Sequence, residues 1–313
     1  MSGIKVSYNR PGRYQAEYMA YLALKVLLRI APFGLMMRNS DSIGRWIFHG
    51  LGIRNDVALA NLKYAFGDSY NGEPVETISN RFSAHLFKIV LELANIRKFI
   101  MHMDDYVKLR NLDRLKNALQ KGKGVLLPSG HFGNFELGAL ALAWAGLPVS
   151  VLIKHMRNPF IDRDLTDIRQ SLGTEVLDIE YAGRGILSAL KRNRIVCILG
   201  DQDVGLMRGT IVDFFGHPTS TPNGTARMAI QTGAPVLPCF IYRKENDTHV
   251  LEVEPALEVD CSRNMREKEI RRITQEISLI LEGWIYAHPE QYFWLHRRWK
   301  STSDGKLLYQ KKI

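Results

Sequence analysis

The chain has few cysteines and lacks the short signatures of several common enzyme classes. Its three cysteines among 313 residues include no CxxC pair and no Cys/His spacing, so neither a disulfide framework nor a zinc site is indicated. It has no serine in a Gly-x-Ser-x-Gly elbow, no His-Glu-x-x-His helix and no Gly-x4-Gly-Lys-Ser/Thr loop. We therefore expect no metal, no cofactor and no serine acyl-enzyme. Cys197 and Cys239 lie in strand-like apolar runs, which predicts core positions in a reducing compartment.

The chain also lacks an uninterrupted apolar run long enough to cross a bilayer. Residues 18–37 have the length, but Lys25 and Arg29 interrupt them. Each such charge at the centre of a spanning helix costs roughly 2.5–3.5 kcal/mol. The two cations are four residues apart and share one helical face, which is typical of a helix lying in the membrane interface. Packing on the protein's own core is the alternative. The basic amino terminus lacks the apolar core of a cleavable signal peptide.

Positive charge is in excess, with 42 Lys and Arg against 32 Asp and Glu, a formal net charge of +10. This excess favours a polyanionic partner, such as nucleic acid, an anionic membrane face or an acidic carrier protein. A generic contribution to solubility is the alternative. No helix-turn-helix, RNA-binding or zinc-finger pattern accompanies the charge, so we do not expect nucleic acid as a partner.

The periodicity of apolar residues changes along the chain. Residues 14–100 are helical in pattern, with a turn at Asn71–Gly72 and Pro74 at the first position of a long helix. Short apolar runs then alternate with helical segments. The expected strands are 125–128, 149–153, 175–177, 195–199, 236–242 and 249–253, the last two as a hairpin. The expected helices are 111–120, 135–144, 160–172, 184–191, one capped by Thr221 with Pro222 at its first position, and about Met265 to His288.

Alternating strands and helices predict an α/β fold with a mainly parallel central sheet and helices on both faces. An N-terminal helical layer precedes it. We assign residues 1–110 to an N-terminal helical, membrane-associating region and residues 111–313 to the α/β core, as one catalytic unit. Ligands of such sheets bind at the carboxyl ends of the strands.

His131 and Glu136 are the candidate catalytic pair. The strand that ends at Pro128 leads to His131, and Asn134 is suited to cap the next helix, with Glu136 in its first turn. A carboxylate partner would fix the tautomer of the histidine and raise its basicity, so that it takes a proton from a hydroxyl. The positive helix terminus would favour charge that develops on a carbonyl oxygen. Helix capping by a polar loop is the alternative interpretation.

Three further segments present polar residues at strand ends or near the carboxyl terminus. Lys154 and Arg157 follow the second strand and suit a phosphate or carboxylate, although a solvated loop gives the same pattern. Asp201 and Asp203 follow the fourth strand, where they suit sugar hydroxyls or an Asx-capped turn, while two carboxylates alone do not make a convincing site for a divalent ion. Residues 289–300 are an aromatic-basic run that includes Arg297 and Arg298. This run suits either the bilayer interface or core packing.

Together these segments resemble the late acyltransferases of lipid A biosynthesis, the lauroyl/myristoyl transferase family within the lysophospholipid acyltransferase-like group. The resemblance covers residues 54–300 and depends on six ordered motifs. They are Arg54–Phe66 (R-x-x-V-x-x-x-N-L-x-x-A-F), Gly130–Glu136 (G-H-x-G-N-x-E), Lys154–Pro159 (R/K-x-x-x-N-P), Asp201–Gly205 (D-x-D-x-G), Phe214–Gly216 with the following helix to Pro238, and His296–Lys300 (H-R-R-F/W-K). Lys154 stands where many members have Arg.

The resemblance implies transfer of a fatty acyl chain from acyl-carrier protein or acyl-CoA to a hydroxyl of a lipid A precursor. It also implies a location at the cytoplasmic face of the inner membrane, as a monotopic protein or with a single N-terminal anchor, and no metal. By position, His131 is the general base and Glu136 its partner. The other expected substrate-binding residues are Lys154, Arg157, Asp201, Asp203, Arg297 and Arg298, the two aspartates with a structural role as the alternative.

Two alternatives remain at this point. A related enzyme could acylate another glycolipid or phospholipid, such as a lysophospholipid, a phosphoinositol mannoside or an aminolipid. A non-catalytic membrane-binding protein could use the same fold and basic surface, but the presence of both His131 and Glu136 argues against it.

Overall fold

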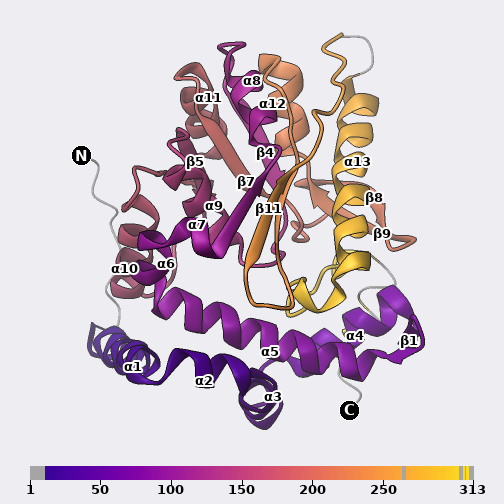
Figure 1. The fold of residues 1–313 in the computed structure, drawn as a ribbon. Coiled ribbons are helices and arrows are strands. Elements are labelled where there is room, and N and C mark those ends of the chain that lie inside the picture. Colours follow the sequence, from indigo (N-terminus) through magenta and orange to yellow (C-terminus); the bar gives the residue numbers. More distant parts are fainter. Residues whose placement is uncertain (1–10, 263–265, 303–305, 307, 310–313) are drawn as a thin grey trace.

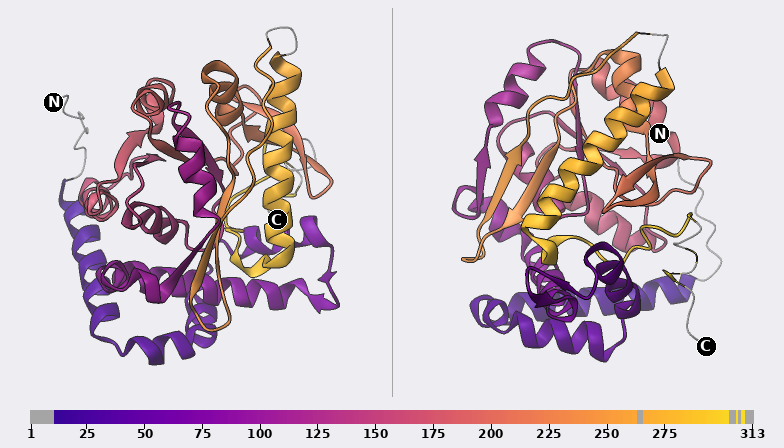
Figure 2. Two further views of the ribbon diagram at one scale, coloured as in Figure 1. Left: turned by 45° about the horizontal axis from the view of Figure 1, so that its top comes forward. Right: turned by 90° about the vertical axis from the view of Figure 1, so that its right-hand side faces the viewer.

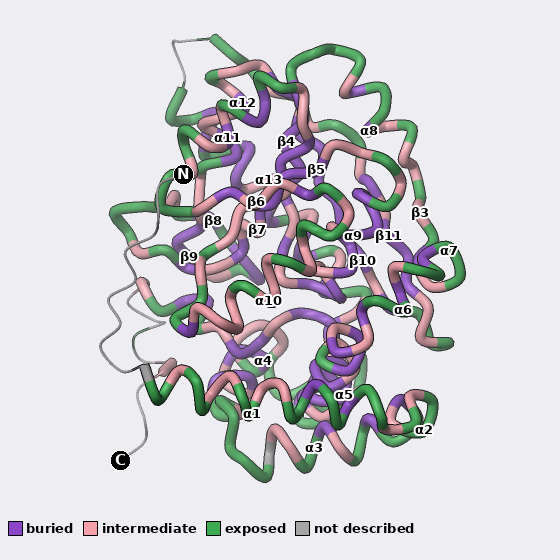
Figure 3. The backbone as a smooth tube through the Cα atoms, turned by 90° about the vertical axis from the view of Figure 1, so that its left-hand side faces the viewer, coloured by how far each residue is buried: buried purple, intermediate pink, exposed green. Residues whose placement is uncertain are grey.

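The computed structural model describes residues 11–262, 266–302, 306 and 308–309. Its amino-terminal part is a layer of helices along one side of the molecule, at the bottom of Figure 1. These helices are α1 (Pro11–Ile30), α2 (Phe33–Arg38), α3 (Ser40–Gly50), α4 (Asn55–Phe66) and α5 (Val75–Ala94). Figure 3 shows that α5 is largely buried, whereas α1 is mostly exposed. The expected helical layer is therefore present, and residues 1–10 of the assigned region lie outside the described residues.

The apolar segment of residues 18–37 forms two helices. α1 ends at Ile30, two residues before Pro32, because a proline disfavours helical geometry at the residue that precedes it. The Nζ atom of Lys25 lies 2.5 Å from Oδ2 of Asp164, so this face of α1 packs on the protein itself. Within the described ranges, no helix is both long and apolar enough to cross a bilayer.

The turn expected before the long helix is confirmed. Asn71 and Gly72 have positive φ angles of 51° and 79°, a geometry that asparagine and glycine tolerate best. Two short strands flank them, β1 (Ser69–Tyr70) and β2 (Glu73–Pro74). α5 begins at Val75, with Pro74 as its N-cap rather than its first residue. Its apolar side chains Ile78 and Phe82 are buried.

A four-stranded parallel sheet forms the centre of the remaining chain. In spatial order its strands are β4 (Val125–Ser129), β7 (Ile195–Leu199), β5 (Val149–Ile153) and β6 (Glu175–Asp178). The connecting helices are α9 (Phe135–Trp144), α10 (Pro159–Gln170) and α11 (Ala182–Lys191), with the short η1 (Ile179–Tyr181) before α11. The expected α/β class, the mainly parallel sheet and the helices around it are confirmed.

A second, three-stranded sheet adjoins the first. β10 (Cys239–Arg243) and β11 (His249–Val253) form the expected antiparallel hairpin. β3 (Val107–Arg110) pairs in parallel with β11. Its residues had been assigned to the N-terminal helical region, yet they belong to this sheet. The helices around β3 are α6 (Ile96–Met101), α7 (Met103–Tyr106) and α8 (Leu112–Leu119).

The segment after β7 contains a hairpin that was not expected from the sequence. β8 (Gly209–Phe214) pairs antiparallel with β9 (His217–Pro222). The prediction of a helix start at Thr221 and Pro222 is wrong, because both residues lie in β9, and α12 (Gly224–Thr232) begins after the N-cap Asn223. Thr221 pairs with Thr210 across the hairpin, in keeping with the strand preference of β-branched residues.

The last long helix, α13 (Arg266–Ala287), lies between the β10–β11 and β8–β9 hairpins, as Figures 1 and 2 show. Met265, where it was expected to begin, lies outside the described residues. A short helix, η3 (Pro289–Gln291), follows it.

The aromatic side chains of residues 289–300 form part of the core. Trp294 and Trp299 are 0% exposed and belong to an apolar cluster with side chains of α4, α5, β8 and α13. Asn61 of α4 donates hydrogen bonds of 2.6 and 2.7 Å to the carbonyl oxygens of Trp294 and His296. Of the two interpretations of this run, the structure supports core packing.

We expect Trp294→Ala to lower the free energy of unfolding by about 3–5 kcal/mol, because it removes a buried indole and leaves a cavity. Chemical denaturation followed by circular dichroism measures this change. Trp46→Ala is the matched control, since that side chain is 72% exposed, and it should stay within about 0.5 kcal/mol of the wild type. Equal losses in the two variants would contradict the buried position of Trp294.

Candidate active site

His131 and Asp201 lie side by side at the carboxyl edge of the parallel sheet. His131 follows β4 and Asp201 follows β7, and these strands are neighbours, with Ser129 opposite Leu199. Nδ1 of His131 lies 2.8 Å from Oδ1 of Asp201. The carboxylate that contacts the histidine therefore comes from the adjacent strand, and not from Glu136 in the next helix.

The loop that carries His131 approaches β10 so closely that only glycine fits at residue 133. Gly133 has φ of 57°, and a Cβ atom there would lie 1.8 Å from the carbonyl oxygen of Ile241. The N–H of Gly133 donates to the carbonyl oxygen of Gln291, at 2.9 Å, and the carbonyl oxygen of His131 accepts from the N–H of Phe293, also at 2.9 Å. The loop is thus fixed between β10 and the segment after α13.

Asn134 connects this loop to a buried charged group. Its Oδ1 accepts from the N–H of Leu137, which confirms its expected role as N-cap of α9. Its Nδ2 donates to Oε2 of Glu92 at 2.8 Å. Glu92 also pairs with Arg243 and lies 3.0 Å from Nε2 of His249. Although burial raises the pKa of Glu92, Arg243 and His249 hold it well below its usual range.

The surroundings of His131 favour its protonated form. Burial opposes the charge, but the charge of Asp201 and its hydrogen bond outweigh that effect, and Glu136 adds to them, so the pKa of His131 is raised. Burial likewise raises the pKa of Asp201, but His131 and Arg298 outweigh it and lower that pKa. Asp201 is therefore a carboxylate that stabilises an imidazolium beside it.

The second nitrogen of His131 is available to a ligand. Donation from Nδ1–H to Asp201 assigns the tautomer in which Nε2 carries a lone pair. Nε2 lies 3.4 Å from Nε2 of Gln202, a weak contact. The His131 side chain is 22% exposed. A partly exposed, basic nitrogen oriented by a buried carboxylate is the arrangement of a general base.

Glu136 lies in the first turn of α9, as expected, but its hydrogen bonds go to α10. Nε of Arg169 donates to Oε2 of Glu136 at 2.9 Å, and Nη2 donates to Oε1. Glu136 thus acts on His131 through its charge rather than through a hydrogen bond in this structure. Arg169 was not among the candidates from the sequence, because nothing in α10 distinguished it from the other charged residues of that helix.

Lys154 and Arg157 are exposed on the loop after β5. Asn158 ends this loop and contacts two helices. Its Oδ1 accepts from the N–H of Phe160 at 3.1 Å, which caps α10, and its Nδ2 donates to the carbonyl oxygen of Tyr14 in α1 at 2.9 Å. The loop is therefore fixed at its base, while its two cations face solvent.

Asp203 and Arg298 are buried and bind the protein itself. Oδ2 of Asp203 accepts from the N–H of Ser301 at 2.9 Å. Nη1 of Arg298 donates to the carbonyl oxygen of Ser220 at 2.9 Å. These contacts support a structural role for both residues rather than the expected contact with substrate. Arg297, by contrast, is exposed.

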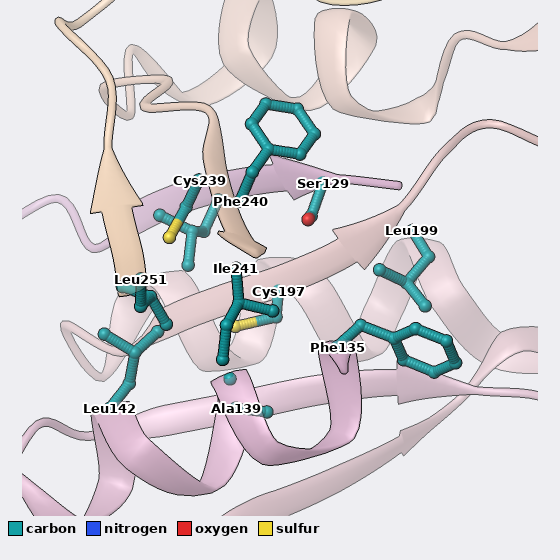
Figure 4. A pocket seen from close by; sticks show the side chains of 12 residues that line it. Ser129, Phe135, Ala139, Leu142, Cys197, Leu199, Cys239, Phe240, Ile241 and Leu251 are labelled. Atoms are coloured by element: carbon teal, nitrogen blue, oxygen red, sulfur yellow. The ribbon is translucent and has the colours of Figure 1, made fainter. Parts of the chain in front are cut away.

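A small apolar cavity of about 40 Å³ is lined by side chains of α9, of β4 and β7 and of the β10–β11 hairpin. Figure 4 shows Ser129, Phe135 and Leu199 at one end, Cys197 and Ile241 in the middle, and Leu142 and Leu251 at the other. The ring centre of Phe135 lies 5.1 Å from that of His131. Cys197 and Cys239, expected in the apolar interior, both line this cavity, and burial raises the pKa of Cys197 to about 12.

Within the part of the chain that the structure describes, no three His, Cys, Asp or Glu side chains lie together as a metal-binding group. His131, Asp201 and Gln202 lie close together at the carboxyl edge of the sheet, and Phe135, whose ring is near that of His131, also lines the apolar cavity. Together they are suited to move a proton next to an apolar ligand.

The chain is similar to bacterial acyltransferases over most of its length. The family model described as bacterial lipid A biosynthesis acyltransferase matches residues 3–301. The lipid A biosynthesis acyltransferase of Haemophilus influenzae is 26% identical over 305 residues, 97% of this chain and 93% of that protein. The lipid A biosynthesis palmitoleoyltransferase of Escherichia coli K12 is 27% identical over 281 residues, 88% of each protein. A phosphatidylinositol mannoside acyltransferase of Mycobacterium tuberculosis is 32% identical over 213 residues, 67% of this chain and 64% of that protein.

We expect the pKa of His131 to lie above its ordinary value and to fall in Asp201→Asn, because that change removes the adjacent negative charge. Glu136→Gln should lower it less, since Glu136 contributes charge without a hydrogen bond. NMR titration of histidine labelled with ¹⁵N measures both shifts. A pKa that is unchanged in Asp201→Asn, or that falls further in Glu136→Gln, would contradict this assignment.

Proposed function

Because the chain belongs to the bacterial lipid A biosynthesis acyltransferase family, we propose that it transfers a fatty acyl chain to a hydroxyl of a lipid A precursor. The chain is an acyltransferase, as its relatives are. The observation that carries the mechanism is the contact of 2.8 Å between His131 and the buried Asp201, next to Phe135, which lines an apolar cavity.

In the proposed reaction, Nε2 of His131 accepts the proton of the acceptor hydroxyl as its oxygen attacks the carbonyl carbon of an acyl thioester. A carbon–oxygen bond forms and the carbon–sulfur bond breaks. The proton then passes from the imidazolium to the departing thiolate. Asp201 stabilises the imidazolium that forms in between, which is the differential stabilisation that a general base requires. The positive terminus of α9, beside His131, favours the negative charge on the carbonyl oxygen.

Glu136 has a supporting role in this proposal. Its charge raises the basicity of His131, and its ion pair with Arg169 aligns the first turn of α9 with α10. Replacing Glu136 thus disturbs both the charge beside the base and the packing of the helix that begins next to it. We retain Glu136 as the partner of His131, acting through charge.

The surroundings of the site suit an anionic acceptor and a hydrocarbon donor chain. The apolar side chains of the cavity favour the acyl group over water. We assign Lys154, Arg157 and Arg297, all exposed, to phosphate groups of the substrates. The donor is an acyl thioester of acyl-carrier protein or of coenzyme A, both anionic and therefore complementary to a chain with a formal charge of +10.

We also propose that α1–α3 hold the protein on the cytoplasmic face of the inner membrane without crossing it. Large apolar side chains on these helices are exposed, and four of them, Met19, Val26, Leu27 and Ile30, share one face of α1. Trp46 of α3 is exposed as well, and tryptophan suits the depth of the lipid headgroups. Lys25, turned inwards to Asp164, leaves the outer face of α1 apolar.

The decisive experiment is the lipid profile of a deletion strain of the source bacterium that carries plasmid copies of the gene. We expect mass spectrometry to show loss of one acyl chain from lipid A in the deletion strain and its return with the wild-type copy. His131→Ala should lower turnover by roughly 100- to 10,000-fold and leave the chain missing, and Glu136→Ala should act in the same direction. Lys191→Ala, a change at an exposed residue, is the control. Restoration by His131→Ala would contradict the mechanism, and loss of acyl chains from another glycolipid or phospholipid would assign a different acceptor.

For the membrane contact, we expect the double substitution Leu27→Glu and Ile30→Glu to move the protein from the membrane fraction to the soluble fraction. Charged side chains on that face carry a large cost of transfer into lipid. Leu279→Glu on α13, where the side chain is 54% exposed, is the matched control and should remain bound. Unchanged partitioning of the double variant would place the main anchor elsewhere.

A further inference from the structure

A second group of exposed apolar side chains lies at the carboxyl edge of the parallel sheet, on the segments that follow β5, β6 and β7. We call this group the apolar rim. It consists of Met156, Ile179, Tyr181, Val204, Leu206 and Met207, all exposed. Because the carboxyl ends of parallel strands meet at one edge, the three segments begin at the same edge of the sheet at which His131 follows β4. The rim is separate from α1–α3 in the chain.

Single exposed apolar residues are ordinary on a protein surface, but a series of them on neighbouring segments indicates an interaction site. Met207 is 97% exposed. The base of its loop is nevertheless fixed, since the N–H of Gly205 donates to Oδ1 of Asp203 at 2.9 Å and Oγ of Ser220 donates to the carbonyl oxygen of Gly205 at 2.8 Å. Leu206 and Met207, five and six residues after Asp201, are therefore exposed on a loop whose base is fixed.

The charges around the rim are mostly positive. In the segments 154–158, 178–184 and 200–208, the exposed ionised side chains are Lys154, Arg157, Arg184 and Arg208, with Glu180 as the exposed carboxylate. Apolar side chains interspersed with cations suit the headgroup region of an anionic bilayer, where the apolar groups reach the acyl chains and the cations meet phosphates.

One of the three segments of the rim lies beside the helix that we assign to the membrane. Asn158 binds the carbonyl oxygen of Tyr14, and the rings of Tyr18 and Phe160 stack at 5.5 Å. The amino-terminal part of α1 therefore lies beside the loop that carries Met156. Figure 1 shows α10 next to α1 in the same place.

We propose that the apolar rim inserts into the anionic lipid surface, so that the carboxyl edge with His131 faces the bilayer and meets an acceptor that stays in the membrane. This inference rests on the proposed function, because it supplies that site with a lipid-embedded substrate. An acidic carrier protein is the other partner that fits the cations. Six apolar side chains on three segments favour the bilayer, since an acidic protein surface would leave them largely in water.

A fluorescent label at residue 207 tests the proposal. Cys261 is exposed, whereas burial raises the pKa of both Cys197 and Cys239. The full-length Cys261→Ser protein therefore receives either Met207→Cys or, as a matched control on α13, Leu279→Cys, and an environment-sensitive label. The protein without a new cysteine reports residual labelling. The vesicles contain equal parts of phosphatidylcholine and phosphatidylglycerol, with a lipid-borne quencher in a second set.

We expect a blue shift and quenching by the lipid for the label at residue 207 and neither change at residue 279. Leu206→Glu with Met207→Glu should weaken vesicle binding about tenfold, because both apolar contacts are lost. Equal responses at residues 207 and 279, or a response to acyl-carrier protein but not to vesicles, would overturn the proposal. The vesicle experiment contains no acyl donor, so its outcome does not depend on the acyltransferase function. That function is tested separately by the lipid profile.

Discussion

The buried ion pair between Glu92 and Arg243 holds together the parts of the molecule on which the His131 loop depends. Glu92 belongs to α5 and Arg243 to β10, and both are almost fully buried. Taking two charges out of water costs several kcal/mol per ion unless further hydrogen bonds compensate for it. His249 and Asn134 supply those bonds. One carboxylate thereby connects the helical layer, the second sheet and the residue that caps α9 directly after the His131 loop.

Local sequence patterns predicted most helices and strands of this fold well, but they did not predict which of these elements lie side by side. The bounds of α9, β5 and β7 match the expected ones, because each is an apolar or amphipathic run that ends at a turn. Strand order, by contrast, depends on contacts between distant segments. No local pattern indicates that β7 lies between β4 and β5, and this order is what brings Asp201 to His131. Spacing along the chain suggested Glu136 instead.

The aromatic-basic run of residues 289–300 is a second case in which the local sequence pattern did not decide the structure. Its composition suits a membrane interface and a protein core equally, since both accept large rings beside polar groups. The position of this run in the core depends on contacts with distant residues. Asn61, 233 residues before Trp294, donates a hydrogen bond to the carbonyl oxygen of Trp294. The hairpin of β8 and β9 was missed for a related reason, because Thr221 and Pro222 have the local chemistry of a helix start.

The side-chain amide of Asn158 forms hydrogen bonds with two helices. The oxygen holds the start of α10, and the nitrogen holds α1. Farther along α10, Arg169 binds Glu136 in the first turn of α9, the helix next to His131. The exposed helix α1 and the first turn of α9, beside His131, are thus connected through α10 by the contacts of Asn158 and Arg169. Asn158→Asp would keep the oxygen that accepts from the N–H of Phe160 and lose the nitrogen that donates to Tyr14. The cap of α10 would remain, and the contact with α1 would be lost.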